Sequence, residues 1–163
     1  IAEIVSGMSW EHFFRTHLAA PLAIDFAYEP LSTGRLGGGG RTNAESYARV
    51  LSLHLAGGAI GQRRVLSPEL VASMQEPSGA RFSNSVRGIR AQGYGMGWWL
   101  DTLDTRGQAV IASCPGAWGA YPWIDRSRQY GAFLFIRSSL FVGVALQRRL
   151  RPLIEQALDG GSA

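Results

Sequence analysis

The alternation of apolar and polar residues between Gly93 and Arg137 predicts a group of β-strands joined by short turns. Four runs rich in aromatic and β-branched residues are separated by Gly-, Asp- and Ser-containing segments, and they span Tyr94–Leu100, Gln108–Ser113, Trp118–Asp125 and Tyr130–Arg137. Because a parallel crossover needs about a dozen residues or more, connections this short make neighbouring strands antiparallel. The pattern therefore predicts an antiparallel meander.

Apolar residues recur at helical spacing on both sides of this meander, and they predict helices at 10–19, 43–56, 68–75 and 146–158. We expect Pro21 to stop the first helix, and a capping box of Thr42 and Glu45 to start the second. The last helix is expected to turn its apolar side chains inward, namely those of Leu150, Leu153, Ile154 and Ala157.

Together these elements predict an α/β domain of the α+β type, with an antiparallel sheet flanked by helices. We expect residues 1–163 to form a single, partial domain. Its mainly helical part, 1–92, contains a Gly-rich loop, and 93–163 contains the meander and the terminal helix. The chain opens without methionine on an uncapped helical pattern, Ile1–Ser6, which suggests a piece of a longer protein.

Composition places the chain among globular proteins, with 46% hydrophobic and 17% charged residues in 163. All 16 basic residues are arginine, and no lysine occurs. The net charge of +4 is scattered and accompanies no nucleic-acid motif, so we expect no nucleic-acid partner. No apolar run reaches the roughly 18 residues of a membrane span. We therefore expect no transmembrane segment.

The histidines and the Gly-rich loop do not predict a metal or cofactor site. His12 and His17 lack the i, i+4 spacing of a shared metal face, and packing is the default role of His54. The loop Leu31–Arg41 contains four consecutive glycines, but a phosphate-binding P-loop also needs a lysine. We predict no metal and no cofactor.

The segment Cys114-Pro115-Gly116-Ala117 lies where the second predicted strand ends and the third begins. Gly116 allows a backbone to approach a ligand closely, and Pro115 cannot donate to a ladder, so this point is either a sheet edge or a bulge. One interpretation is a substrate-binding edge, and the other is a kinked strand without a ligand. A thiol nucleophile at Cys114 would need a nearby base, which no spacing in the sequence supplies; a buried, inert cysteine is favoured.

In this order the segments resemble the C-terminal half of the serine β-lactamase-related superfamily, which includes class C β-lactamases, penicillin-binding D,D-peptidases and esterase relatives. The resemblance covers nearly the whole chain. It rests on Ile4-Val5-Ser6-Gly7 with Pro21-Leu22, Gly37–Thr42 with Tyr47-Ala48-Arg49, Gly57-Gly58 through Leu66-Ser67-Pro68-Glu69, Tyr94-Gly95-Met96-Gly97-Trp98, and Gly116-Ala117-Trp118-Gly119 with Trp123-Ile124-Asp125. It implies a β-lactamase/transpeptidase-like fold that is incomplete in this chain.

The catalysis of that superfamily uses Ser-x-x-Lys, Tyr/Ser-x-Asn and Lys/His-Thr/Ser-Gly motifs. The first cannot occur in a chain without lysine, and the second would precede Ile1; Phe82-Ser83-Asn84 comes too late in the order to replace it. The third falls on Cys114-Pro115-Gly116, where only the glycine matches, and Ala117 would supply an oxyanion N–H by analogy. We therefore expect no nucleophile or base within this chain.

The resemblance implies a serine hydrolase that cleaves a small acyl ester or amide through an acyl-enzyme, with the nucleophile in a missing N-terminal half. Without a cation at position 114, classical β-lactam and D-alanyl substrates are disfavoured, and the esterase-like branches fit better. A periplasmic or secreted bacterial location follows from the resemblance alone. The alternative is a non-catalytic binding or scaffold module that retains the fold.

Overall fold

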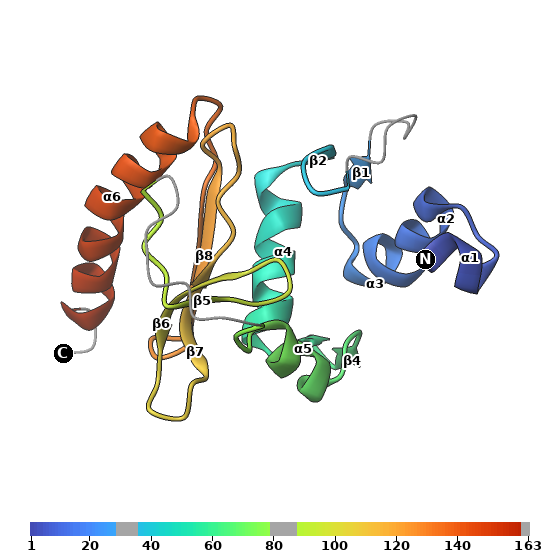
Figure 1. Ribbon diagram of the computed structural model, residues 1–163, viewed down its shortest axis with the longest axis horizontal. Coiled ribbons are helices and arrows are strands. Elements are labelled where there is room, and N and C mark those ends of the chain that lie inside the picture. Colours follow the sequence, from blue (N-terminus) through green and yellow to red (C-terminus); the bar gives the residue numbers. More distant parts are fainter. Residues whose placement is uncertain (29–35, 79–87, 161–163) are drawn as a thin grey trace. The chain divides into compact units, whose positions relative to one another are not determined.

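The computed structural model describes residues 1–28, 36–78 and 88–160 (Figure 1). The chain divides into two compact units. The first unit comprises Ile1–Pro68 and the second Glu69–Ala163. Most of helix α5 (Pro68–Met74) belongs to the unit that contains the meander. Phe82-Ser83-Asn84 lies outside the described residues.

The first unit is mostly helical. Its elements are α1 (Ala2–Ser6), α2 (Trp10–Phe14), the π-helical η1 (Arg15–Ala19), α3 (Ala20–Leu22), β1 (Phe26–Tyr28), β2 (Gly40–Thr42), α4 (Ala44–Leu55), β3 (Ala59–Ile60) and β4 (Arg63–Arg64). Aromatic rings from α2 and β1 pack together, with the centroid of Phe14 lying 5.8 Å from that of Trp10 and 5.3 Å from that of Phe26. Contacts of this kind fix short elements that would not be stable alone.

The sequence predicted that the helix after Ser9 would end at Pro21, but the structure shows that it continues past this residue. Ser9 caps it by accepting a hydrogen bond from the N–H of His12, and the chain stays helical through η1 to Leu22. Pro21 lies in the first turn of α3, where its missing N–H is tolerated, and the wider π-turn before it relieves the clash of the ring with a preceding carbonyl. The helix ends instead at Ala23, which has a φ of 51°.

The start of α4 also differs from the predicted capping box. Its N-cap is Asn43, whose side chain accepts a hydrogen bond from the N–H of Ser46. Thr42 belongs to β2, and its hydroxyl donates to the carbonyl of Asp25 across the β1–β2 pair. The asparagine oxygen reaches the free N–H groups of the first turn, so Thr42 remains available to tie two strands together.

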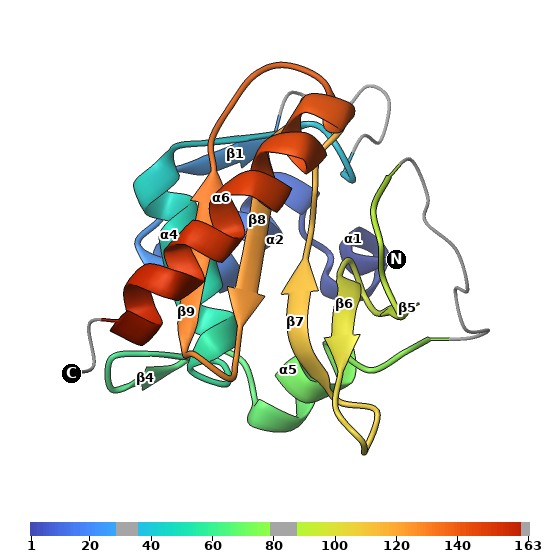
Figure 2. The same ribbon diagram turned by 90° about the vertical axis from the view of Figure 1, so that its left-hand side faces the viewer.

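The second unit is built on a five-stranded antiparallel sheet in the order β5-β6-β7-β8-β9, which confirms the meander (Figure 2). The strands are β5 (Gly93–Tyr94), β6 (Trp99–Leu103), β7 (Ala109–Ser113), β8 (Tyr121–Asp125) and β9 (Tyr130–Leu134). The first predicted strand, Tyr94–Leu100, is in fact divided between β5 and β6. A turn closed by the Gly95 N–H on the Trp98 carbonyl separates them, and Gly97 there has a φ of 81°.

Buried polar groups fix the turn from β8 into β9. The Asp125 side chain is fully buried, and it accepts hydrogen bonds from the N–H and hydroxyl of Ser127 and from Arg128. The next residue, Arg126, donates from Nε and Nη2 to Oε1 of Gln75, at 3.0 and 2.8 Å. These bonds join the turn to the end of α5, and they provide donors for the buried carboxylate of Asp125 and the side-chain oxygen of the buried Gln75.

Helix α6 (Leu140–Gly160) lies along one face of the sheet, over β8 (Figure 2). The core on this face comprises Ile89, Tyr121, Trp123 and Val144, with Ile154 packed against it. The predicted inward face of the helix was therefore correct for Ile154. It was wrong for Leu150 and Leu153, which are 38% and 61% exposed, and for Ala157, which is exposed as well. The helix begins six residues before the predicted start, so the buried stripe runs through Gly143, Val144 and Gln147.

Candidate functional site

The candidate segment Cys114–Ala117 continues β7 beyond the end of its pairing with β6. The last paired residues of that ladder are Trp99 and Ser113. On its other side the segment remains bonded toward β8, because Cys114 N–H donates to the Pro122 carbonyl at 3.1 Å. The two sides of the segment therefore differ, one being part of a hairpin and the other lying past the end of the β6–β7 ladder.

The expectation that Pro115 lies in an edge strand or a bulge was wrong. β7 is an interior strand of the sheet, and the irregularities in its pairing lie at the far end of the strand, near Thr102 of β6. The backbone N–H groups of Cys114 and Gly116 face β8, so Pro115 falls on the alternate, β6-facing side. A residue without an N–H fits where the β6–β7 ladder has already ended.

Ala117 occupies the turn that links β7 and β8. The turn is closed by the N–H of Gly119 on the carbonyl of Gly116, at 3.0 Å, and the N–H of Gly116 donates to the Ala120 carbonyl at 2.8 Å. Among the hydrogen bonds of the described residues, none is donated by the N–H of Ala117. Ala117 is also exposed, so its N–H is available to solvent or to a bound group.

The Cys114 thiol is a poor nucleophile in this setting. The side chain is half-buried, and burial raises the pKa of the thiol above its ordinary value. The pKa of Tyr94 is raised as well, first by burial and then by the neighbouring Cys114. A thiol with a raised pKa is almost entirely protonated at neutral pH, which favours the inert cysteine over the thiol-enzyme alternative.

The two glycines of this turn carry different constraints. A side chain at Gly116 would find only ordinary contacts, the nearest being the Ala120 carbonyl oxygen at 3.7 Å. Gly119 instead has a φ of 89°, and a Cβ there would approach the backbone of Ser139 at 2.7 Å. Packing therefore explains Gly119 but does not explain Gly116.

The other residues considered from the sequence do not assemble into a site. His12, His17 and His54 all lie in the first unit, and among the residues that the structure describes no cluster of histidine, cysteine and acidic side chains could hold a metal. Within the same described ranges, no helix is long and apolar enough to cross a membrane.

Comparison with known families decides the identity of this fold. The family model described as Beta-lactamase matches residues 1–154. The chain belongs to the beta-lactamase family. No curated protein matches it significantly. The family match confirms the superfamily resemblance that the sequence motifs indicated.

Solved structures agree with this beta-lactamase-family assignment. A provisionally assigned beta-lactamase from Bacteroides dorei DSM 17855 is 29% identical with a TM-score of 0.71, over 91% of this chain and 52% of that one. Simvastatin synthase (LovD) from Aspergillus terreus has the same fold at 16% identity and a TM-score of 0.60, over 84% of this chain and 45% of that one. The chain thus spans about half the length of these proteins.

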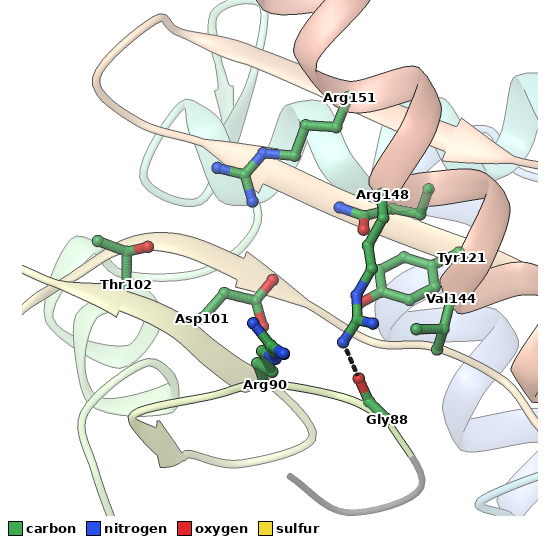
Figure 3. Close-up of a pocket in the computed structure, with 9 residues that line it drawn as sticks. Gly88, Arg90, Asp101, Thr102, Tyr121, Val144, Arg148 and Arg151 are labelled. Carbon is green, nitrogen blue, oxygen red and sulfur yellow. Dashed lines mark hydrogen bonds between the residues drawn. The ribbon is translucent and has the colours of Figure 1, made fainter.

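The structure also reveals a polar cavity in this beta-lactamase-family chain that the sequence did not predict. It has a volume of about 170 Å³ and is lined by residues of β6, β8, α6 and the segment at Gly88–Arg90 (Figure 3). Arg90, Asp101, Arg148 and Arg151 contribute charged side chains. No local pattern could have indicated it, because these residues come together only through the pairing of the strands and the packing of α6.

Proposed function

We propose that this chain is the C-terminal part of a serine hydrolase, which cleaves a small acyl ester or amide through an acyl-enzyme. The nucleophile and base, a Ser-x-x-Lys pair, would lie outside these 163 residues. Within the chain, the segment Cys114–Ala117 would form the substrate-facing strand end, and the N–H of Ala117 would donate to the oxyanion.

The observation that carries this proposal is the combination of a family match over residues 1–154 with the open backbone at Ala117. A serine hydroxyl becomes nucleophilic only beside a base, and this chain contains no lysine to serve as one. The oxyanion donors of acyl transfer need no particular side chain, so an exposed backbone N–H at the matching position is sufficient.

The substrate class follows from the side chains at this strand end. A cation where Cys114 stands would hold a substrate carboxylate, but the raised pKa of Cys114 keeps that position neutral. We therefore propose an uncharged acyl ester or amide rather than a β-lactam or a D-alanyl peptide. The absence of a constraint from packing at Gly116 supports close contact of a substrate with the backbone there.

A non-catalytic binding module is the second candidate function, and the residues Cys114-Pro115 favour it. They replace the charged or imidazole group and the hydroxyl that the third motif of the superfamily supplies. A domain that retained the fold without these groups could still hold an acyl ligand at the same strand end.

The test is to label the longest available form of the protein with a fluorophosphonate and to assay p-nitrophenyl acyl esters. We expect labelling at a serine upstream of Ile1, no labelling of the 163-residue chain, and loss of ester hydrolysis when that serine is replaced by alanine. Absence of labelling and hydrolysis in the longer protein would favour the binding module.

Gly116→Ala tests the role of this chain in the same assay. Because a Cβ at Gly116 meets only ordinary contacts, we expect unchanged stability. Ester turnover should fall by about 100-fold, the effect of a roughly 1 Å misplacement of a substrate. The matched control is Gly160→Ala, at a position where a Cβ has nothing within 4 Å. Equal turnover in the two variants would contradict the placement of the substrate at Gly116.

A further inference from the structure

The polar cavity of the second unit is open to solvent on one side, and it is lined by elements that are distant in the sequence. Asp101 and Thr102 come from β6, Tyr121 from β8, and Val144, Gln147, Arg148 and Arg151 from α6, while Gly88 and Arg90 line a further side (Figure 3). A volume of about 170 Å³ exceeds that of a single water, whose share of the liquid is about 30 Å³. The space can hold a small ion together with some of its water.

The wall of the cavity carries an excess of positive charge. Three guanidinium groups line it, those of Arg90, Arg148 and Arg151. Arg151 forms an ion pair with Glu155, with Nε and Oε1 2.7 Å apart, and Asp101 is the other carboxylate nearby. With both carboxylates ionised, the cluster still keeps one unbalanced positive charge.

The donors of the cavity are only partly used. Arg148 donates from Nη2 to the Gly88 carbonyl (Figure 3). Among the described residues, Arg90 forms no hydrogen bond or ion pair, and the side chain of Gln147, which is only 6% exposed, makes no hydrogen bond either. Gln147 lines the pocket together with these arginines. The wall therefore presents guanidinium and amide donors to an acceptor that enters it.

An ionised Asp101 would repel an anion in this cavity, but its surroundings favour the neutral carboxyl. The hydroxyl of Ser113 donates to Asp101 Oδ1 at 3.0 Å, and no ion pair joins Asp101 to an arginine within the described part of the chain. Burial raises the pKa of Asp101 to about 7, although the bond from Ser113 and the charge of Arg151 act to lower it. Near neutral pH a substantial fraction of the carboxyl is therefore protonated and can donate rather than repel.

We propose that this cavity binds a small oxyanion, such as a phosphate, a sulfate or a carboxylate group, through Arg90, Arg148, Arg151 and the amide of Gln147. Guanidinium groups suit such ligands because their planar arrays of N–H donors match two oxygens at once. The site lies between the sheet and α6, and it does not depend on the function proposed for Cys114–Ala117. Binding there ties the Gly88–Arg90 segment, β6 and α6 to one ligand.

The test uses the 163-residue chain and sulfate, with amide and arginine side-chain chemical shifts recorded by NMR during titration against chloride at constant ionic strength. We expect saturable shifts at the residues that line the cavity. Arg90→Gln should weaken sulfate binding by about tenfold, the effect of losing a charge-assisted hydrogen bond. The matched control is Arg149→Gln, which removes an exposed arginine of α6 outside the cavity and should leave the affinity unchanged.

A second arm uses pH, because sulfate keeps its charge between pH 5.5 and 8.5 and any change in affinity then reports on the protein. The ionisable groups around Asp101 are Tyr121, Arg90, Arg148, Arg151 and, through Arg151, Glu155. The carboxyl of Asp101, whose pKa is raised to about 7, changes its charge within that range. We expect tighter binding at the lower pH.

Asp101→Asn should hold the affinity at its low-pH value throughout, since Asn retains the acceptor for Ser113 without the charge. Acetate in place of sulfate distinguishes a site that also takes a planar carboxylate from one that needs a tetrahedral ion. Chemical-shift changes that do not saturate would overturn the proposal and leave a water-filled cavity. An equal loss of sulfate affinity in the Arg90 and Arg149 variants would do the same. A pH dependence that persists in Asp101→Asn would also contradict the role given to that residue.

Discussion

The closest approach between α6 and the β7–β8 turn allows a sharp test of the fold. Gly143, in the second turn of the helix, lies against the backbone of Gly119, and a Cβ at Gly143 would collide with the Gly119 carbonyl group and its Cα. These are backbone atoms, which cannot move aside as a flexible side chain could. We therefore expect Gly143→Ala to destabilise the protein even though alanine is the better helix former.

The magnitude follows from two opposing effects. Replacing a glycine inside a helix by alanine normally stabilises by about 0.5–1 kcal/mol. Forcing an additional carbon into a packed contact costs about 1–3 kcal/mol, and here Gly119 has a φ of 89° and is itself held against Ser139. The collision should prevail, with a net loss of about 1–2 kcal/mol in the free energy of unfolding.

The assay is urea denaturation followed by tryptophan fluorescence, with Gly160→Ala as the matched control in the same helix. A Cβ at Gly160 has nothing within 4 Å, so this variant should be neutral or slightly stabilised. A Gly143→Ala protein as stable as the wild type would refute the close approach of α6 to Gly119. Equal destabilisation of both variants would show that the effect does not come from the collision.

Three further changes in the second unit have definite expected outcomes. Asp125→Ala should cost about 2 kcal/mol in urea unfolding, because the β8–β9 turn loses the buried carboxylate that accepts hydrogen bonds from Ser127 and Arg128. Burial acts to raise the pKa of Asp125, but bonds from Ser127 outweigh it and lower the pKa, so wild-type stability should fall on acidification below about pH 4. Gln75→Glu should stabilise the protein by about 1 kcal/mol, because a carboxylate keeps both bonds from Arg126. It also removes a buried amide nitrogen that has no partner among the described residues. A loss of stability in this variant would contradict the prediction. Asp101→Asn should stabilise by about 4 kcal/mol at pH 8 and have little effect at pH 4, because a pKa raised from 3.8 to about 7 makes ionisation in the fold costly. Equal gains at both pH values would rule out that cause.

Local chemistry was sufficient to predict the meander. Its turns contain residues that bend the chain by themselves: Asp104 accepts hydrogen bonds from the N–H groups of Arg106 and Gln108, and Gly107 has a φ of 79°. The same holds for α1, which ends at Gly7 with a φ of 67°, a backbone conformation that glycine adopts readily. Signals of this kind act within a few residues, so they are visible without tertiary information.

Predictions that depended on competition between neighbouring groups were less successful. Thr42 and Asn43 can both cap α4, and the structure assigns the cap to Asn43 because Thr42 bonds to Asp25 in the adjoining strand pair. Pro21 is a helix breaker by its chemistry, but the π-turn before it removes the clash. In both cases a second contact decided between two locally acceptable conformations.

The sequence by itself determined the family, the antiparallel meander and the position of Cys114–Ala117 at the end of a strand, because motif order and turn residues are local properties of the chain. Only the tertiary structure placed Asp101 beside Ser113 and beneath the arginines of α6, since the Asp101–Ser113 contact requires a specific strand register and the approach of the arginines requires a specific helix rotation. Burial and charge depend on what surrounds a group in space. The raised pKa of Asp101 and the excess of donors around its cavity therefore exist only in the folded chain.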